Sequence, residues 1–141
     1  MAYTDAQGTN NSFRSNKTYS DLNLNFTKNP ATNDVARLTD IEAVKRAVRN
    51  LVLTNEFERP FHPEIGSSIR GLLFETITPL NAVLLEDRIR EVIVNFEPRA
   101  ELTGIQVFDE IDNNQYRVII NFTVLGSSEG TTITEFLQRL R

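Results

Sequence analysis

The chain has 141 residues, 40% of them hydrophobic, which is enough for one domain around a single core. Its formal net charge of -4 argues against nucleic acid as a partner, because a phosphate-binding surface needs clustered Lys and Arg. The absence of Cys excludes disulfides and Cys-ligated metal, and no apolar run approaches the roughly 18 residues of a membrane span. We therefore expect a soluble protein that binds neither nucleic acid nor membrane.

The first segment, residues 1–20, is rich in Asn, Ser, Thr, Gln and Gly and has few large apolar anchors. Such a composition buries too little surface to offset the entropy of ordering, so we expect a flexible N-terminal arm before a single domain of residues 21–141. Residues 21–27 then alternate apolar and polar, which predicts a short strand. The side chains on its apolar face are Leu22, Leu24 and Phe26.

A first helix is predicted to begin at Thr39, where Thr39 and Glu42 have the spacing of a capping box. Apolar residues recur at intervals of three and four from Ile41 to Val52 and define the buried face. The outward side chains include Lys45, Arg46 and Arg49. We interpret these cations as a solvated helix face; a site for an acidic partner is the alternative.

Residues 54–75 are predicted to form a packed connector between two helices. Pro60 and Pro63 interrupt helical structure, and the segment contains many large apolar side chains, including Phe57 and Phe61. A second helix is predicted from Pro79 to about Asn95, with Thr78 as N-cap and Pro at the first helical position. Pro98 disfavours helical geometry in the residue before it and ends this helix.

Two strands are predicted over residues 102–109 and 116–125, joined as an antiparallel hairpin across the turn-rich residues 112–114. Residues 131–140 are predicted to add a third strand, because Thr and Ile favour strand geometry; a C-terminal helix is the alternative. The predicted fold is therefore α+β, with two main helices packed on a small antiparallel sheet that ends in a three-strand meander.

The acidic connector raises the possibility of catalysis. Three of its acids could supply the carboxylate pair of a glycosidase: Glu56, Glu58 and Glu64. Sequence spacing does not establish the separation that this chemistry needs, and the single His, His62, has no Ser or Cys motif beside it. Phosphate-loop, zinc and calcium motifs are absent from the sequence, so we predict no catalytic residue, cofactor or metal.

The triplet Glu97-Pro98-Arg99 is the more informative polar feature. The Arg99 guanidinium presents a planar fork of donors suited to a carboxylate, while Pro98 fixes the path of the chain between the two charges. An intramolecular ion pair at the end of a helix and a rigid polar contact for a partner protein are both compatible with this pattern.

The block Phe57–Glu75, the later Glu97-Pro98-Arg99 triplet and the ending Phe136–Arg141 together resemble the baseplate wedge proteins of contractile-tailed phages. This sheath-initiator family also has counterparts in contractile secretion machines. The resemblance extends over roughly residues 38–141 and implies a structural subunit of the virion's inner baseplate, assembled in the host cytoplasm and not an enzyme. The family has also carried a lysozyme-like label, so a peptidoglycan glycosidase remains the alternative.

The resemblance further implies that Glu97, Pro98 and Arg99 contact neighbouring wedge subunits. It implies that the terminal sheet accepts strands of the tail sheath protein, and the tail tube is a further candidate partner. An edge strand presents unpaired amides and carbonyls, which agrees with strand addition. The last strand then adds four expected partner-binding residues: Thr132, Thr134, Phe136 and Gln138.

Overall fold

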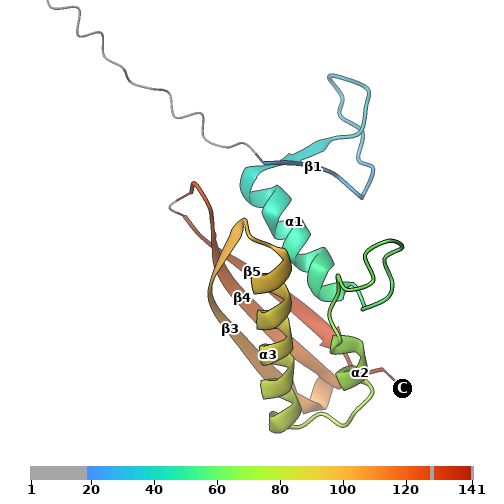
Figure 1. Ribbon diagram of the computed structural model, residues 1–141, viewed down its shortest axis with the longest axis vertical. Helices are drawn as coiled ribbons and strands as arrows, with labels where there is room; N and C mark the ends of the chain where they lie inside the picture. The colour runs from blue at the N-terminus through green and yellow to red at the C-terminus, as the bar shows by residue number, and fades with distance from the viewer. Residues whose placement is uncertain (1–18, 128, 141) are drawn as a thin grey trace, which may run out of the picture.

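The computed structural model describes residues 19–127 and 129–140. The predicted arm therefore lies outside the described residues, except for Tyr19 and Ser20. The described part of the chain has the predicted α+β fold: the helices cover one face of an antiparallel three-stranded sheet, and a separate two-stranded ribbon lies beside the start of the first helix (Figure 1).

The helices are α1 (Asp40–Leu53), the short α2 (Ile69–Leu73) and α3 (Pro79–Phe96). The predicted N-cap of α3 is confirmed, because the Thr78 hydroxyl accepts a hydrogen bond from the Asn81 amide at 3.2 Å. The capping box predicted at Thr39 is wrong. The Thr39 side chain makes no capping hydrogen bond, and Glu42 instead pairs with Lys45.

The start of α1 is held by the backbone of Tyr19 instead. The Asp40 amide donates to the Tyr19 carbonyl at 2.7 Å, and the Tyr19 amide donates to Asp40 Oδ1 at 3.2 Å. Asp40 itself has a left-handed φ of 49°. A contact across twenty residues of sequence thus replaces the local capping that the Thr39–Glu42 spacing predicts.

The main sheet contains β3 (Ala100–Glu110), β4 (Gln115–Val124) and β5 (Gly130–Gln138), in that order and antiparallel throughout. The predicted hairpin is confirmed, and its turn is a 3-10 segment at Ile111–Asn113. The predicted third strand is also confirmed and the alternative C-terminal helix is wrong. The β4–β5 register is unbroken, whereas the β3–β4 register shifts between Leu102 and Gly104, which marks a bulge in β3.

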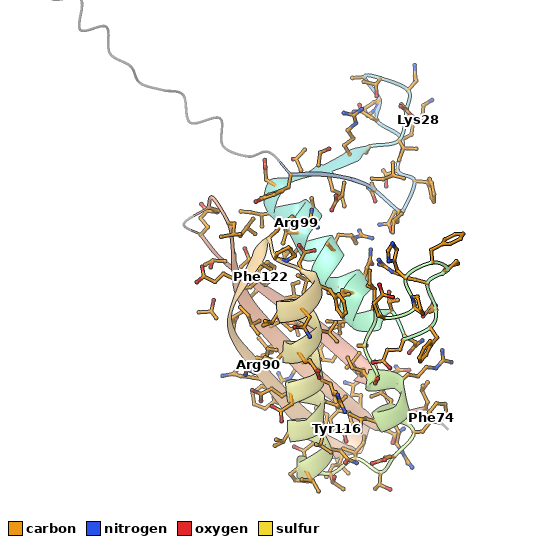
Figure 2. All side chains as sticks on the ribbon, in the orientation of Figure 1. Lys28, Phe74, Arg90, Arg99, Tyr116 and Phe122 are labelled. Atoms are coloured by element: carbon orange, nitrogen blue, oxygen red, sulfur yellow. The ribbon has the colours of Figure 1, made fainter. Side chains whose placement is uncertain are left out.

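The core lies between the helices and the inner sheet face. Every second residue of β4 is buried, from Tyr116 to Val124, and packs against the apolar stripes of α1 and α3. Tyr116 and Phe122 are almost fully buried at opposite ends of this layer, behind α3 (Figure 2). The Tyr116 hydroxyl also accepts from the Thr78 amide at 3.2 Å, which ties β4 to the start of α3.

The first strand is shorter than predicted. β1 (Ser20–Leu22) pairs with β2 (Arg37–Thr39), and the chain turns directly after Leu22. The Asn23 side chain accepts from the Asn25 amide at 3.0 Å, and Phe26 adopts a left-handed φ of 51°. The alternation of residues 21–27 therefore does not produce a buried face, and its apolar side chains are more than half exposed: Leu22, Leu24 and Phe26.

The prediction of a packed connector is wrong for its first half. Phe57 and Phe61 are 81% and 96% exposed, whereas Ile69 and Leu73 in α2 belong to the core. Backbone hydrogen bonds hold the loop in place of apolar burial: the Ser67 amide donates to the Thr54 carbonyl at 2.7 Å, and the Phe57 amide to the Pro63 carbonyl at 2.8 Å. The buried Ser67 hydroxyl also donates to the Val52 carbonyl of α1.

Candidate functional site

The strand β5 forms one edge of the main sheet. It pairs with β4 along its whole length, from Gly130 to Gln138. Among residues 19–127 and 129–140, no other strand pairs with it, so its outer row of amides and carbonyls is available for pairing. β3 forms the opposite edge, but its bulge interrupts the regular row of backbone groups there. β5 is thus the more regular of the two edges.

The four residues predicted in this strand share the sheet face that points away from the helices. All four are exposed: Thr132, Thr134, Phe136 and Gln138. Thr132 donates to Asn121 Oδ1 on β4 at 2.8 Å, and Phe136 lies opposite Arg117. Arg117 in turn stacks on Phe108 of β3, with its guanidinium 5.0 Å from the ring centroid.

The Glu97-Pro98-Arg99 triplet connects α3 to β3 and contains a bidentate ion pair. Arg99 Nε and Nη2 donate to the two carboxylate oxygens of Glu97 at 2.7 and 2.9 Å. The Glu97 side chain is only 7% exposed, and its hydrogen bonds raise the pKa of the Arg99 guanidinium. Pro98 is exposed between the two charges. The intramolecular pair, one of the two readings of this pattern, is therefore present.

Arg99 also reaches the first strand. Its Nη1 donates to Asp21 Oδ2 at 3.4 Å, and its guanidinium lies 5.6 Å from the centroid of the Tyr19 ring. Sequence reasoning missed Tyr19 and Asp21 as partners of Arg99, because about eighty residues separate them and no local motif links them. Arg99 thus joins the β1–β2 ribbon to the end of α3 (Figure 2).

A hollow of about 390 Å³ opens beside Arg99, between β1, α1, the loop of residues 54–68 and the end of α3. Its walls combine apolar side chains with three arginines and two carboxylates: Leu22, Leu24, Leu51, Ile65, Phe96, Arg46, Arg59, Arg99, Asp21 and Glu97. A surface hollow that combines apolar side chains with charged groups of both signs is suited to a protein partner.

The three connector acids lie in exposed positions. Glu56 and Glu64 line one hollow of about 170 Å³, whereas Glu58 turns back to accept hydrogen bonds from Asn55. His62 Nδ1 lies 3.1 Å from Glu64 Oε1. Hydrogen bonds from the backbone and from His62 lower the pKa of the Glu64 carboxyl, which is the opposite of the shift that a glycosidase general acid needs.

Within the described residues, no three His, Asp or Glu side chains are grouped so that they could hold a metal ion. The helices of the same part of the chain are too short or too polar to span a membrane.

Two solved structures share this fold. A putative tail lysozyme from Geobacter sulfurreducens aligns with a TM-score of 0.65 at 21% identity, over 71% of this chain and 91% of that one. A chain of the baseplate of the anti-feeding prophage aligns with a TM-score of 0.60 at 22% identity, over 88% of both chains. At these identities the likeness concerns the fold alone, and this fold occurs in the baseplate of the anti-feeding prophage.

Sequence comparison is more specific. The chain is 32% identical to the baseplate wedge protein gp25 of Enterobacteria phage T4 over 114 residues, which are 81% of this chain and 86% of that protein. The family model described as baseplate wedge protein gp25 matches residues 39–129. The class is therefore a structural component of the baseplate of a contractile tail. The chain belongs to the baseplate wedge protein gp25 family, which confirms the resemblance carried by the connector block and the Glu-Pro-Arg triplet.

Proposed function

We propose that this wedge subunit initiates assembly of the tail sheath by accepting a β-strand from the sheath protein. The observation that carries the proposal is the open edge of β5, which pairs with no strand other than β4 among the residues that the structure describes. Strand addition joins subunits through main-chain hydrogen bonds, and side chains on alternate positions set the register. On β5 these side chains are Thr132, Thr134, Phe136 and Gln138.

Hydrogen–deuterium exchange with and without purified sheath protein tests this proposal. The outward amides of β5, at alternate positions between Gly130 and Gln138, are expected to exchange rapidly in the free protein and to become protected in the mixture. The edge of β3 provides the internal control and keeps its exchange rates. Unchanged exchange in β5, or protection confined to β3, would refute strand addition at β5.

The Arg99 hollow is proposed as the contact with neighbouring wedge subunits, with Glu97, Pro98 and Arg99 forming its rigid end. Support comes from the exposed apolar wall beside the cations: Leu22 and Leu24 are 52% and 53% exposed. Half-exposed leucines next to a fixed arginine are suited to the core of an interface, where apolar contact excludes water around the charged group.

Capture by purified wedge subunits tests this contact. Leu24→Asp places a charge in the apolar wall without disturbing the core, and it is expected to reduce capture strongly. Leu80→Asp is the matched control, because Leu80 is 69% exposed at the start of α3 and does not line the hollow. Equal capture of both variants would contradict docking at this site.

The proposed setting is the tail baseplate of a virion, assembled in the host cytoplasm, with the tail tube as a further candidate neighbour. Residues 21–141 are proposed to act as one domain, because the ribbon, helices and sheet of the described residues connect through Arg99 and one core. Residues 1–20 would precede this domain as an arm.

The protein is further proposed to act without catalysis. Its 32% identical relative carries the name of a baseplate wedge protein, and the Glu64 carboxyl has a lowered pKa. One observation favours the glycosidase alternative, since Glu56 and Glu64 line the same hollow. A peptidoglycan turnover assay separates the two: turnover by the purified protein that disappears in Glu64→Gln would establish the enzyme and overturn the proposal.

A further inference from the structure

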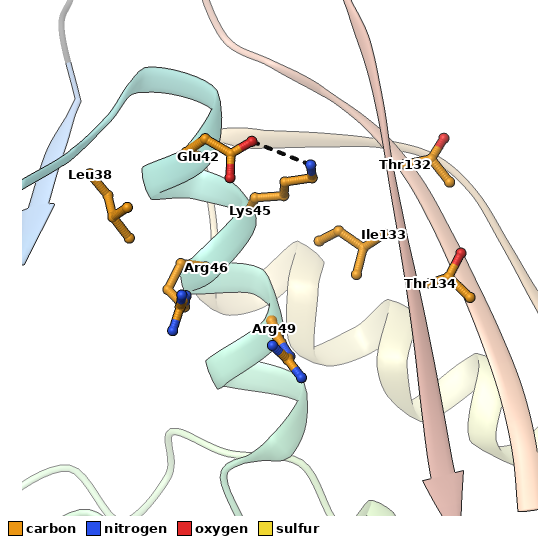
Figure 3. A pocket seen from close by; sticks show the side chains of 8 residues that line it. All are labelled: Leu38, Glu42, Lys45, Arg46, Arg49, Thr132, Ile133 and Thr134. Carbon is orange, nitrogen blue, oxygen red and sulfur yellow. Dashed lines mark hydrogen bonds and ion pairs between the residues drawn. The ribbon is translucent and has the colours of Figure 1, made fainter. Parts of the chain in front are cut away.

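A hollow of about 330 Å³ lies between α1 and β5. Its walls are formed by Leu38 and by two groups of side chains from these elements: Glu42, Lys45, Arg46 and Arg49 of α1, and Thr132, Ile133 and Thr134 of β5. Successive side chains of a strand point to opposite faces, so a hollow that touches three residues in a row lies beside the strand. This hollow therefore runs along the open edge of β5 (Figure 3).

This hollow is a groove with a positive charge, although the net charge of the whole chain is -4. Lys45 Nζ lies 3.3 Å from Glu42 Oε1, and Arg49 Nη2 lies 2.9 Å from Glu135 Oε1. The third cation, Arg46, donates to the neutral Asn25 side chain at 3.1 Å. Three cations against two carboxylates leave one positive charge in surplus, and this charge belongs to Arg46. Lys45 and Arg49 each donate one hydrogen bond to their carboxylate, and an ammonium or guanidinium group carries further N–H donors that an acidic occupant can use.

The spacing of the cations matches that of a strand. Lys45 and Arg49 are four residues apart on α1, a rise of about 6 Å, while residues two apart on a strand are about 6.7 Å apart. Figure 3 shows α1 and β5 running side by side in the same direction, with Lys45 and Arg49 on the side of α1 next to β5. Carboxylates at alternate positions of an added strand would thus meet both cations.

At the C-terminal end of the β5 edge, the surface is mostly apolar instead of charged. A second hollow of about 150 Å³ lies between the end of α1, α2 and the end of β5, and its walls are mostly apolar. Its β5 side is formed by Leu137, and Leu140 closes it by donating its amide to the Leu73 carbonyl at 2.8 Å. A segment bound along the whole edge would therefore be acidic beside α1 and apolar beside Leu137.

We propose that the sheath segment which adds to β5 is acidic, with two carboxylates two residues apart facing Lys45 and Arg49 and an apolar side chain near Leu137. This inference rests on the proposed strand addition and specifies the chemistry of the added strand. The chain's own first 18 residues do not fit this description, because they contain one acid, Asp5, and two cations, Arg14 and Lys17.

The test is capture of purified sheath protein by the full-length wedge protein. Lys45→Glu combined with Arg49→Glu is expected to weaken capture about tenfold at low salt, because attraction is replaced by repulsion at two positions. Raising the ionic strength should reduce the amount of sheath protein captured by the parent protein, and so reduce the difference in capture between the parent and the variant. Lys28→Glu is the control for a charge reversal away from the groove, since Lys28 lies at the far tip of the β1–β2 connection (Figure 2).

Because Arg49→Glu would also place a second carboxylate beside Glu135, Lys45→Gln combined with Arg49→Gln serves as the milder second variant. Protection of β5 amides by sheath protein, with equal capture of all variants, would overturn the acidic strand and leave strand addition intact. Failure of sheath protein to protect β5 would instead refute the proposed function. Binding of a synthetic peptide of residues 1–18 along β5, in competition with sheath protein, would also overturn the proposal.

Discussion

At the scale of single residues, Arg99 has more than one role. Two of its nitrogens hold the nearly buried Glu97, a third reaches Asp21, and its plane lies over Tyr19. A guanidinium held on three sides keeps a fixed orientation, which lowers the entropic cost of presenting it to a partner. The same contacts make Arg99 important to the isolated protein.

Replacing Arg99 with Ala is expected to lower the free energy of unfolding by about 1–3 kcal/mol, because the Glu97 carboxylate would remain nearly buried without its partner. Urea denaturation measures this loss. Glu97→Gln in the Arg99→Ala background should recover part of it, since the unpaired charge is then absent. A strictly additive double-mutant cycle would contradict coupling between the two side chains.

The Glu64 carboxyl is the second residue with a clear expectation. Its hydrogen bonds favour the ionised form, so its pKa should lie below the ordinary 4.5 in an NMR titration. A depressed folded-state pKa adds stability above the unfolded pKa, and that stability disappears as the pH falls through the folded value. His62→Ala removes one of the hydrogen bonds and should move the pKa upward. A pKa near 6 in the parent protein would instead fit a general acid.

At the scale of elements, the loop of residues 54–68 depends on a close approach of two backbone segments. A Cβ added at Gly66 would lie 2.5 Å from the backbone of Asn55, next to the bridge between Asn55 and Ser67. Gly66→Ala should therefore displace the loop and cost about 1–3 kcal/mol in thermal or urea unfolding. The matched control is Gly71→Ala in α2, where a Cβ has open space and helix propensity predicts a neutral or slightly stabilising effect. Equal stability of the two variants would contradict this.

Element type was predictable wherever the apolar pattern was long. The stripes of α1 and α3 and the alternation of β4 each bury a full face, so periodicity alone predicted them. The pattern failed at short segments, where local hydrogen bonds decide the path of the chain. The Asn23 side chain stabilises a turn before Phe26. At the start of α1, Tyr19 bonds to Asp40, and the predicted capping box of Thr39 and Glu42 does not form. The aromatic residues of the connector also led to a wrong prediction of burial. Phe57 and Phe61 are exposed and adopt left-handed φ values of 64° and 73°.

The candidate site was only partly accessible to sequence reasoning. The Glu-Pro-Arg triplet and the last strand could be named, because each is a contiguous motif. The contacts of Arg99 with the first strand, and the position of the α1 cations beside β5, depend on tertiary packing over 78 and 86 residues of sequence. No local signal contains that information.

At the scale of the whole molecule, the two candidate surfaces occupy different sides of α1. The edge of β5 and its groove lie on one side, and the Arg99 hollow with the β1–β2 ribbon lies on the other. Arg46 lines both hollows, which makes α1 the common wall between them. Such an arrangement would allow the two proposed contacts, one with a wedge neighbour and one with a sheath segment, to form at the same time.

The most direct measurement is a particle reconstruction of the tail base that resolves this subunit in its assembled state. The account predicts a fourth strand, contributed by a sheath subunit, hydrogen-bonded along Gly130–Gln138 on the side away from β4. A reconstruction in which that side of β5 faces solvent, or in which the sheath contacts β3 instead, would contradict it.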